Sequence, residues 1–374
     1  MNIEDFNKTP EAVTTTNYPT PRSVRVYALG GAGINNGAAL AKLFDVEMEK
    51  SHSSFYAKPD ICFIDGSRQN LSKVPDNRIN DVFVMRRMDE TVDRIKYPEG
   101  IELSGGGGDR AYINKVAIDN TPLIMNKFKP SKVLNVLIFS AAGASGATQG
   151  QHLFKELVKQ GYPVIVVLIS VNASASRVMN TNKTLVSLIN YQRSAKVAAG
   201  LFEVNNAGLS VAAEAATDEK ISMFLLQLLA VYSNTASRLD EKDCLNWLDY
   251  YRVTKTEPEL LRVDAVNAVS IGEVVGEVTS VIGIVRPTTE VSPAVENVLN
   301  NALYVKLGVV EHPEAPISEC YLVAHPIDLT MVQAIDSHLD ESNAQIAAHA
   351  TGRERFNNAL SRWNNGSDED GGMI

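Results

Sequence analysis

The sequence predicts an α/β protein: a Rossmann-like parallel sheet, then a buried central helix, then a smaller α/β domain. Three observations support this fold class. Apolar strand-like runs alternate with helical runs through the first 200 residues, which is typical of a parallel sheet covered on both faces. The stretch TDEKISMFLLQLLAVYSNTASR is apolar almost all round, as expected for a helix buried on all sides. After residue 250, four strand-like runs are interrupted by short helices.

The elements follow in order along the chain. The first part predicts strands at SVRVYAL, PDICFIDG, NDVFVMR, VLNVLIFSAA, PVIVVLIS and LFEVNN, and helices at NNGAALAKLFDVEMEK, AYINKVAIDNTPLIMNKF, GQHLFKELVKQG and NKTLVSLINYQRSA. The central helix is expected to carry Asp218 and Glu219 in its first turn, where the helix dipole favours anions. The last part predicts strands at LLRVDAVNAVSI, VTSVIGIVRP, ALYVKLGVV and SECYLVAHP, and helices around SPAVENVLN and from Leu329 onward.

Composition excludes several classes of protein. The net charge of −9 argues against a general nucleic-acid binder, which needs a basic face to neutralise phosphates. The richest apolar stretch, ISMFLLQLLAVY, is too short to span a bilayer, and the polar N-terminus does not read as a signal peptide. Three cysteines lie far apart and the six histidines are scattered. We therefore expect no metal-ligand cluster and no disulfide framework, and a reducing cytoplasm.

Three glycine-rich loops follow strands or lie between elements. They cover residues 30–33, residues 105–108 and the stretch AAGASGATQG at 141–150. Glycine lets backbone N–H groups approach phosphate oxygens, and a helix start adds a favourable dipole. In an open parallel sheet, ligands bind outside the carboxyl ends of the strands. Three such loops suit a polyphosphate that is gripped from several sides, whereas a single loop could be only a structural turn.

The first loop leaves an alternative open. GAGINNG contains a G-x-G-x-x-x-G string similar to a dinucleotide fingerprint, and Asp65 ends the next strand, where an acid could hold a ribose. The spacing from Gly37 to Asp65 exceeds the usual one, and this interpretation leaves the other two loops unexplained. A P-loop is excluded because GxxxxGK[ST] does not occur.

The order of these parts resembles the tubulin/FtsZ family of GTPases over roughly residues 23–340. The resemblance implies a GTP site with Mg²⁺ as cofactor. LGGAGINNG, FIDGSRQ, LSGGGGDR and AGASGAT are similar to four loops of the family, although the last keeps only two glycines of the signature GGGTG[ST]G. By resemblance the nucleotide-binding residues are Gly30, Gly31, Ala32, Gly33, Asn35, Asp65, Gly106, Gly107, Gly108, Ala142, Gly143, Ala144, Ser145, Gly146, Ala147, Arg177, Asn205, Asn206 and Asp218.

The loop after the central helix, RLDEKD, is similar to the family's catalytic N-x-D-x-x-D loop. Asp240 and Asp243 fit its two acids, and Arg238 replaces the asparagine. The resemblance implies that these acids reach the GTP of the next subunit in a filament, so that hydrolysis is coupled to assembly. Taken alone, a D-x-x-D pair more often caps a helix, and that interpretation stays open.

The divergent signature and the acidic tail SDEDGGMI look more like phage and plasmid tubulins than like bacterial division proteins. We expect an arm over 1–22, a GTP-binding domain over 23–210, a central helix over 211–237, a C-terminal domain over 238–345, and a helix with acidic tail over 346–374. The expected partners are further copies of the chain and an adaptor to DNA or a phage structure in a bacterial cytoplasm, with no membrane. The other hypotheses are a weakly nucleotide-binding relative without turnover and a dinucleotide oxidoreductase.

Overall fold

The computed structural model describes residues 22 to 327, except 51, 94, 106–108, 172–174, 207–209, 275 and 290–291. Most of the expected N-terminal arm, and the helix and acidic tail expected at the C-terminus, therefore lie outside the described residues.

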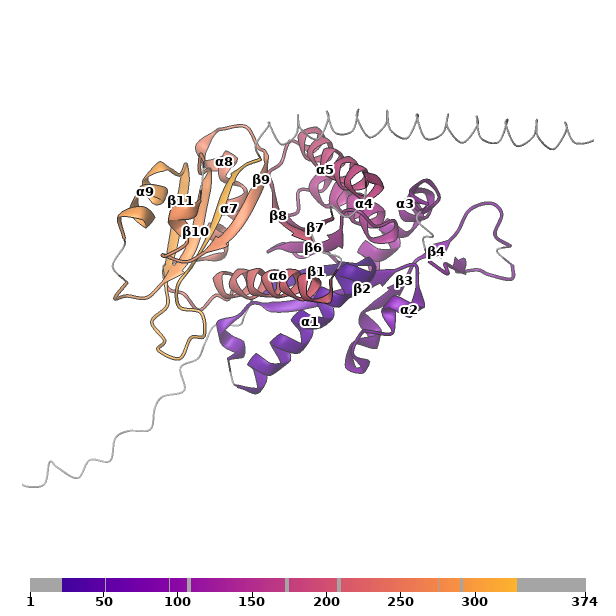
Figure 1. The fold of residues 1–374 in the computed structure, drawn as a ribbon, viewed down its shortest axis with the longest axis horizontal. Coiled ribbons are helices and arrows are strands. Elements are labelled where there is room, and N and C mark those ends of the chain that lie inside the picture. The colour runs from indigo at the N-terminus through magenta and orange to yellow at the C-terminus, as the bar shows by residue number, and fades with distance from the viewer. Residues whose placement is uncertain are drawn as a thin grey trace, which may run out of the picture.

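The first part of the chain alternates strands and helices, as predicted (Figure 1). Its main strands are β1 (Ser23–Leu29), β2 (Lys58–Asp65), β3 (Val82–Val84), β6 (Asn135–Ser140), β7 (Val164–Val171) and β8 (Ala199–Asn206). Its helices are α1 (Gly30–Glu49), α2 (Arg68–Leu71), α3 (Arg110–Lys127), α4 (Ser145–Lys159) and α5 (Ala175–Ala195), followed by the central helix α6 (Val211–Val231). Short elements lie between them: η2 (Ser53–Phe55), η3 (Asp76–Asp81), β4 (Arg86–Arg87) and β5 (Ile101–Glu102).

The second part contains the four strands that the sequence predicted. They are β9 (Leu260–Val266), β10 (Ser280–Val285), β11 (Tyr304–Val309) and β12 (Cys320–Pro326). The helical elements are α7 (Glu241–Leu248), α8 (Tyr250–Thr254), η4 (Ile271–Glu273) and α9 (Pro293–Asn301).

One ten-stranded sheet joins the two parts, in the order β11-β10-β12-β9-β8-β7-β6-β1-β2-β3. From β9 to β3 neighbouring strands are parallel, whereas β12 runs antiparallel to both β9 and β10. All these strands stay parallel, but the direction in which the chain adds them changes between β1 and β6. The chain first adds β2 and β3 on one side of β1 and later adds β6, β7 and β8 on the other. Such a switch point creates a crevice at the carboxyl ends of the strands.

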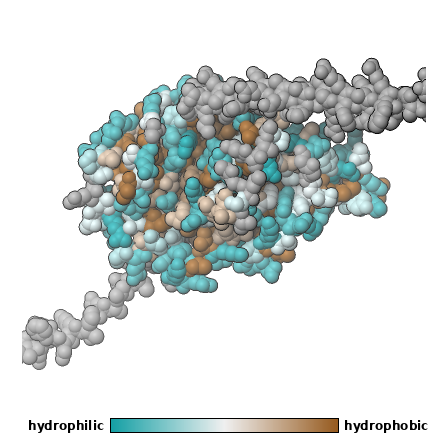
Figure 2. All heavy atoms as spheres, viewed as in Figure 1, coloured by the Kyte–Doolittle hydropathy of each residue, from teal (hydrophilic) through white to brown (hydrophobic). Residues whose placement is uncertain are grey.

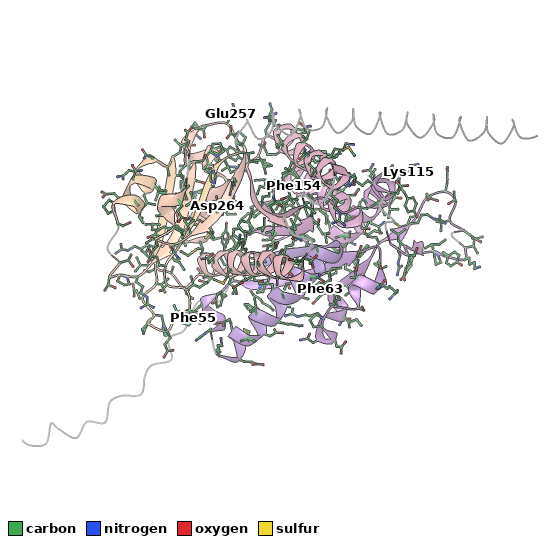
Figure 3. The ribbon with its side chains drawn as sticks, viewed as in Figure 1. Phe55, Phe63, Lys115, Phe154, Glu257 and Asp264 are labelled. Atoms are coloured by element: carbon green, nitrogen blue, oxygen red, sulfur yellow. The ribbon has the colours of Figure 1, made fainter. Side chains whose placement is uncertain are left out.

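Helices cover both faces of the sheet, in agreement with the predicted α/β architecture (Figure 1). One core lies between the sheet and helices α1, α6 and α7, and a second lies between the sheet and helices α3, α4 and α5. Phe63 of β2 belongs to the first core and Phe154 of α4 to the second (Figure 3). A smaller core packs α9 against the second part of the sheet.

The central helix begins before the run TDEK, which was expected to form its first turn. Helix α6 begins at Val211, with Ser210 as its N-cap, so Asp218 lies two turns inside the helix and the expectation of a first-turn position was wrong. The second half of α6, from Ile221 to Val231, carries most of its buried side chains, while the first turns are largely exposed. The two short runs at 212–216 and 219–220 account for this exposure, since their small and charged residues have little to bury.

The face of the molecule drawn in Figure 2 carries both polar and apolar side chains. Among the described residues, none of the helices combines the length and hydropathy that crossing a bilayer requires.

Candidate functional site

A pocket of about 350 Å³ lies at the switch point between β1 and β6. We call it the switch-point pocket. The loops that leave β1 and β6 form most of its wall, and β2 contributes the rest. Among the residues that sequence analysis singled out, those that line it are Gly30, Gly31, Ala32, Asp65, Ala142, Gly143, Ala144, Ser145 and Gly146. The structure therefore brings two of the three glycine loops and the predicted acid into one cavity.

The two glycine loops touch through their backbones. Gly30 adopts a φ of +69°, a conformation that glycine tolerates best. A Cβ atom on Gly30 would lie 2.9 Å from the Cα of Gly146, and one on Gly146 would lie 2.6 Å from the carbonyl oxygen of Leu29. Helices α1 and α4 thus start side by side, with no room for a side chain between them.

Both helix starts are open toward the pocket. The N-cap residues of α1 and α4 are Leu29 and Ala144, and neither accepts a hydrogen bond through its side chain. The first N–H groups of a helix lack partners within the helix and carry a partial positive charge. Two adjacent starts of this kind form an anion site suited to phosphate.

Asp65 lies at the end of β2, where it lines the pocket. Its carboxylate accepts hydrogen bonds from the N–H of Gly66 (2.7 Å) and from Nδ2 of Asn70 (2.5 Å). Burial raises the pKa of the Asp65 carboxyl, and these hydrogen bonds oppose part of that effect. A buried carboxylate beside an anion site suits contact with a divalent cation that neutralises phosphate charge.

Arg110, the first residue of α3, braces the loop between β6 and α4. Its guanidinium donates to the carbonyl oxygens of Gly143 (2.8 and 3.0 Å), Ala141 and Asn180 (3.2 Å), and to Oγ1 of Thr184 (3.3 Å). Burial lowers the pKa of Arg110 to about 10. The planar guanidinium holds the carbonyl groups on the outer side of the loop in place. The loop can therefore keep its conformation although alanines replace some of the glycines of the family signature.

Asp218 reaches the first loop through an asparagine. Its Oδ1 accepts from Nδ2 of Asn36 (2.9 Å), and the same amide donates to the carbonyl oxygen of Ala32 (3.0 Å), which lines the pocket. Asn36 is buried, and its Oδ1 accepts no hydrogen bond from the described residues. Asn35, the asparagine that sequence analysis selected, is exposed and accepts from Nζ of Lys73 (3.1 Å).

Several predicted residues lie away from the pocket wall. Gly33 packs against the backbone of Ile138, and Ala147 is buried in the core. Arg177 lies in the first turns of α5 and is exposed. Gly106, Gly107 and Gly108 lie outside the described residues.

Asn205 and Asn206 end β8, at the same edge of the sheet as the pocket. Three strand spacings of about 4.8 Å separate β8 from β1, or roughly 14 Å. The Oδ1 atom of Asn206 is buried and accepts no hydrogen bond from the described residues. The asparagines and the glycine loops therefore suit opposite ends of one elongated ligand.

Asp240 and Asp243 lie beyond the opposite end of α6. Val231 lies thirteen positions after Asp218 in the helix, or roughly 20 Å at 1.5 Å per residue. The two acids form a capping box at the start of α7: Asp240 Oδ1 accepts from the Asp243 N–H (2.8 Å), and Asp243 Oδ2 accepts from the Asp240 N–H (3.1 Å). These hydrogen bonds lower the pKa of the exposed Asp240. Within one subunit, therefore, the acids and the pocket are separate.

No protein-family model matches the chain. Two phage tubulin-like proteins are similar in sequence. That of Pseudomonas phage phiKZ is 26% identical over 229 residues, covering 61% of this chain and 63% of the relative, and that of Pseudomonas phage PhiPA3 is 24% identical over 244 residues, covering 65% and 66%. The matched region thus spans less than two thirds of either relative.

Solved structures share the fold. A protofilament of TubZ from bacteriophage PhiKZ superposes with a TM-score of 0.68 at 20% identity, covering 88% of this chain and 92% of the other. The GDP complex of the phage tubulin PhuZ gives a TM-score of 0.68 at 16% identity, covering 88% and 93%. The fold is therefore that of the tubulin/FtsZ family. The chain is thus similar in sequence to phage tubulin-like proteins and shares the tubulin/FtsZ-like fold.

Sequence reasoning missed three residues that shape the pocket. Arg110 follows the second glycine loop, separated from it only by Asp109, and a cation next to a glycine-rich loop was a usable signal. Asn36 differs from the selected Asn35 only by which face of α1 it occupies, and the helical phase relative to buried Ile34 and Gly37 could have decided between them. Asn70 carried no signal, because its role depends on the fold of the β2–α2 turn.

Proposed function

We propose that this protein binds GTP with Mg²⁺ in the switch-point pocket and hydrolyses it when subunits assemble head to tail into filaments. The observation that carries the proposal is the separation of the acid pair from the pocket along α6. Because neither end holds a complete site, a second subunit has to bring Asp240 and Asp243 to the nucleotide. The TubZ protofilament and the GDP-bound PhuZ support both parts of the proposal by analogy.

The chemistry needs few groups. Phosphoryl transfer to water depends on positioning and on stabilising the charge of the γ-phosphate. The open starts of α1 and α4 supply donors to the phosphates, and Asp65 would hold the cation or its water ligands. A carboxylate of the neighbouring subunit would orient and polarise the attacking water.

The test compares GTP turnover and light scattering as protein concentration rises. We expect both to start at the same critical concentration, because active sites form only at subunit contacts. Turnover that is proportional to total protein without scattering would show a complete site in each subunit and contradict the proposal. Tight GTP binding without turnover would favour a nucleotide-binding structural relative, and a response to neither assay would favour the dinucleotide enzyme.

Asp218 is proposed to select guanine, because a carboxylate can accept from both N1–H and the exocyclic amine of that base. Asp218→Asn should weaken GTP binding about tenfold, since an amide cannot accept twice, and should narrow the preference for GTP over ATP. Fluorescence titration of both nucleotides measures this. Equal affinity of the unmodified protein for GTP and ATP would refute the assignment.

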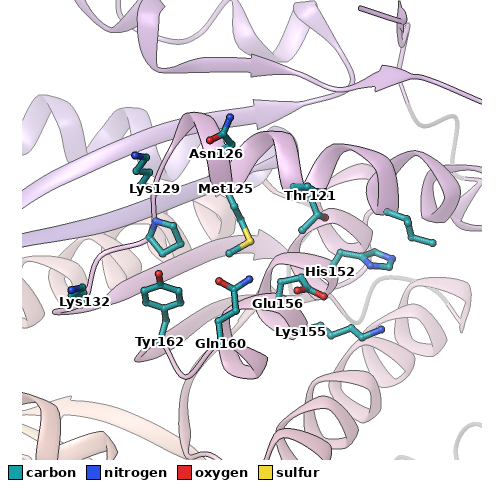
Figure 4. Close-up of a pocket in the computed structure, with 13 residues that line it drawn as sticks. Thr121, Met125, Asn126, Lys129, Lys132, His152, Lys155, Glu156, Gln160 and Tyr162 are labelled. Atoms are coloured by element: carbon teal, nitrogen blue, oxygen red, sulfur yellow. The ribbon is translucent and has the colours of Figure 1, made fainter.

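The acidic tail is proposed to dock on a neighbouring subunit. A groove of about 910 Å³ between α3 and α4 offers a suitable surface, because Met125 and Tyr162 line it and Lys129, Lys132 and Lys155 add positive charge (Figure 4). Complementary charge steers such contacts and makes them salt-dependent.

Deletion of residues 365–374 should therefore raise the critical concentration about threefold and reduce its salt dependence, as measured by sedimentation. The double change Lys129→Glu and Lys132→Glu should reproduce both effects. Unchanged assembly after deletion would show that the tail is only a solvated end.

At the cellular level, the resemblance to phage tubulins leads us to propose that filaments position or segregate phage or plasmid DNA in a bacterial cytoplasm through an adaptor. Imaging labelled DNA in cells that carry the Asp240→Ala, Asp243→Ala double variant tests this role. The DNA should lose its regular position while filaments persist. Normal positioning in those cells would contradict the role.

A further inference from the structure

The edge strand β11 serves as a support for the loop that carries the acid pair, residues 236–243, here called the acid loop. Tyr304, Lys306 and Gly308 alternate along β11 and so lie on the same face of the strand. A Cβ atom on Gly308 would lie 2.8 Å from the Cβ atoms of both Ala236 and Leu239. The absence of a side chain at this position is what allows the acid loop to pack directly on β11.

Backbone hydrogen bonds fasten the same loop to the strand. The N–H of Ser237 donates to the carbonyl oxygen of Val309 (2.9 Å), and the N–H of Val309 donates back to Ser237 (2.8 Å), which forms an isolated antiparallel bridge. Ser237 Oγ also donates to Glu311 (3.2 Å). Arg238 follows with a φ of +66°, so the chain turns sharply before Asp240.

Side chains from β11 then hold one of the two acids. Nζ of Lys306 lies 3.0 Å from Asp243 Oδ2, and the hydroxyl of Tyr304 lies 3.5 Å from Asp243 Oδ1. The Asp243 side chain is only 16% exposed. Asp240 differs, because it is exposed and, within the described part of the chain, no cation lies at ion-pair distance from it. The capping box links the two acids.

We propose that Lys306 is a positioning residue for the assembly-coupled GTPase, acting through Asp243. Lys306 fixes the carboxylate of Asp243 against β11, and the capping box passes that orientation to Asp240. The acid pair is thereby arranged in the free subunit before any neighbour arrives. Assembly then needs only to bring the nucleotide of the neighbouring subunit to the acid pair. The acids themselves do not have to reorient at the subunit contact. The inference rests on the proposed hydrolysis across the subunit contact.

The test uses Lys306→Met, which keeps most of the length of the side chain and removes its charge. Turnover per assembled subunit should fall roughly tenfold, because the acids lose their fixed orientation. The KM for GTP should stay the same, since the nucleotide is held by another subunit's loops. Lys306→Arg should restore most of the turnover, because it can pair with Asp243 again. Lys159→Met is the matched control, as it removes a surface lysine whose pair with Glu156 spans 3.9 Å on α4.

A second measurement separates positioning from folding or assembly. Lys306→Met is mixed as a minor fraction into filaments of the Asp240→Ala, Asp243→Ala double variant, so that turnover arises only where an intact acid pair meets a neighbour's GTP. The same fraction of unmodified protein is the reference, and reduced turnover relative to it supports the inference. Equal turnover in both mixtures, with measurable turnover of the unmodified protein alone, would overturn it. Absence of turnover in the unmodified protein would instead refute the proposed function.

Discussion

The N-termini of α4 and α7 both present the unpaired N–H groups of a helix start, but these groups are left open at α4 and are capped at α7. At α4, Ala144 leaves the first N–H groups without a side-chain partner, and they face the switch-point pocket. At α7, Asp240 and Asp243 satisfy the equivalent groups with a complete capping box. Each helix start carries the same partial positive charge, but only the first remains open to an external anion.

This difference shows how helix starts are divided between binding and support. An uncapped start forgoes about 1 kcal/mol of local stability and gains a place for phosphate. A capped start holds its own carboxylates in a fixed geometry, so that they can act on a ligand bound elsewhere. The α7 carboxylates therefore combine a structural role, which sequence reasoning treated as the rival interpretation, with the proposed catalytic one.

The largest effect is expected at the capped end. Asp240→Ala together with Asp243→Ala should lower GTP turnover by ~10²–10⁴, as when a positioned catalytic base is lost. GTP binding should be unchanged, because each subunit binds nucleotide through its own loops, and filaments should persist longer. Phosphate release and filament lifetime, measured in parallel, check this. Normal turnover would mean that the two acids only cap α7.

At the open end, Gly146→Ala should weaken GTP binding by about 10- to 100-fold. Its Cβ would lie 2.6 Å from the Leu29 carbonyl oxygen, and overpacking of this kind costs ~1–3 kcal/mol and would push α4 away from α1. Gly143→Ala is the matched control in the same loop, because its Cβ would meet only the Ser140 oxygen at 3.7 Å. Equal affinities of the two variants would show that close contact between the helix starts is unimportant.

The smallest effect is expected when the N-cap of α4 is changed to an aspartate, the residue type at the N-cap of α7. Ala144→Asp should raise the stability of the nucleotide-free protein by ~0.3–1 kcal/mol, because an anion favours a helix N-terminus. The same charge should weaken GTP binding about tenfold by repelling the phosphates. Thermal unfolding with and without GTP measures both effects. A variant that gains stability and keeps its affinity would indicate that phosphate lies away from α4.

The sequence predicted the architecture well because its signal is local. The apolar runs of β6 and β7 and the four later strands all appear where the pattern indicated them. The errors lie at helix starts: the residue pattern placed the start of α4 at Gly150 and that of α6 at Thr217, whereas the helices begin at Ser145 and Val211, although the expected bounds of the central helix were 211–237. Small residues such as those at 145–149 carry no amphipathic pattern, and tertiary contacts decide their conformation.

The site was predictable only in part. Spacing and resemblance indicated Asp65 and the loops after β1 and β6, which the structure brings into one pocket because loops that follow strands meet at one edge of a parallel sheet. Their partners Asn36, Asn70 and Arg110 come from other elements, and no local pattern links them. Lys306 lies more than sixty residues after the acid that it contacts, so only the fold could bring the two together.

The length of α6 between the pocket and the acids also limits the number of complete active sites in a filament. If every active site is shared by two neighbours, a head-to-tail row of n subunits contains n − 1 complete sites. At one end of the row, the pocket of the last subunit faces solvent and no neighbour supplies acids to it. The GTP in that pocket would stay unhydrolysed until the next subunit binds. The two ends of such a row then differ chemically. One end carries GTP that has not been hydrolysed, and the other carries an acid loop that contacts no nucleotide.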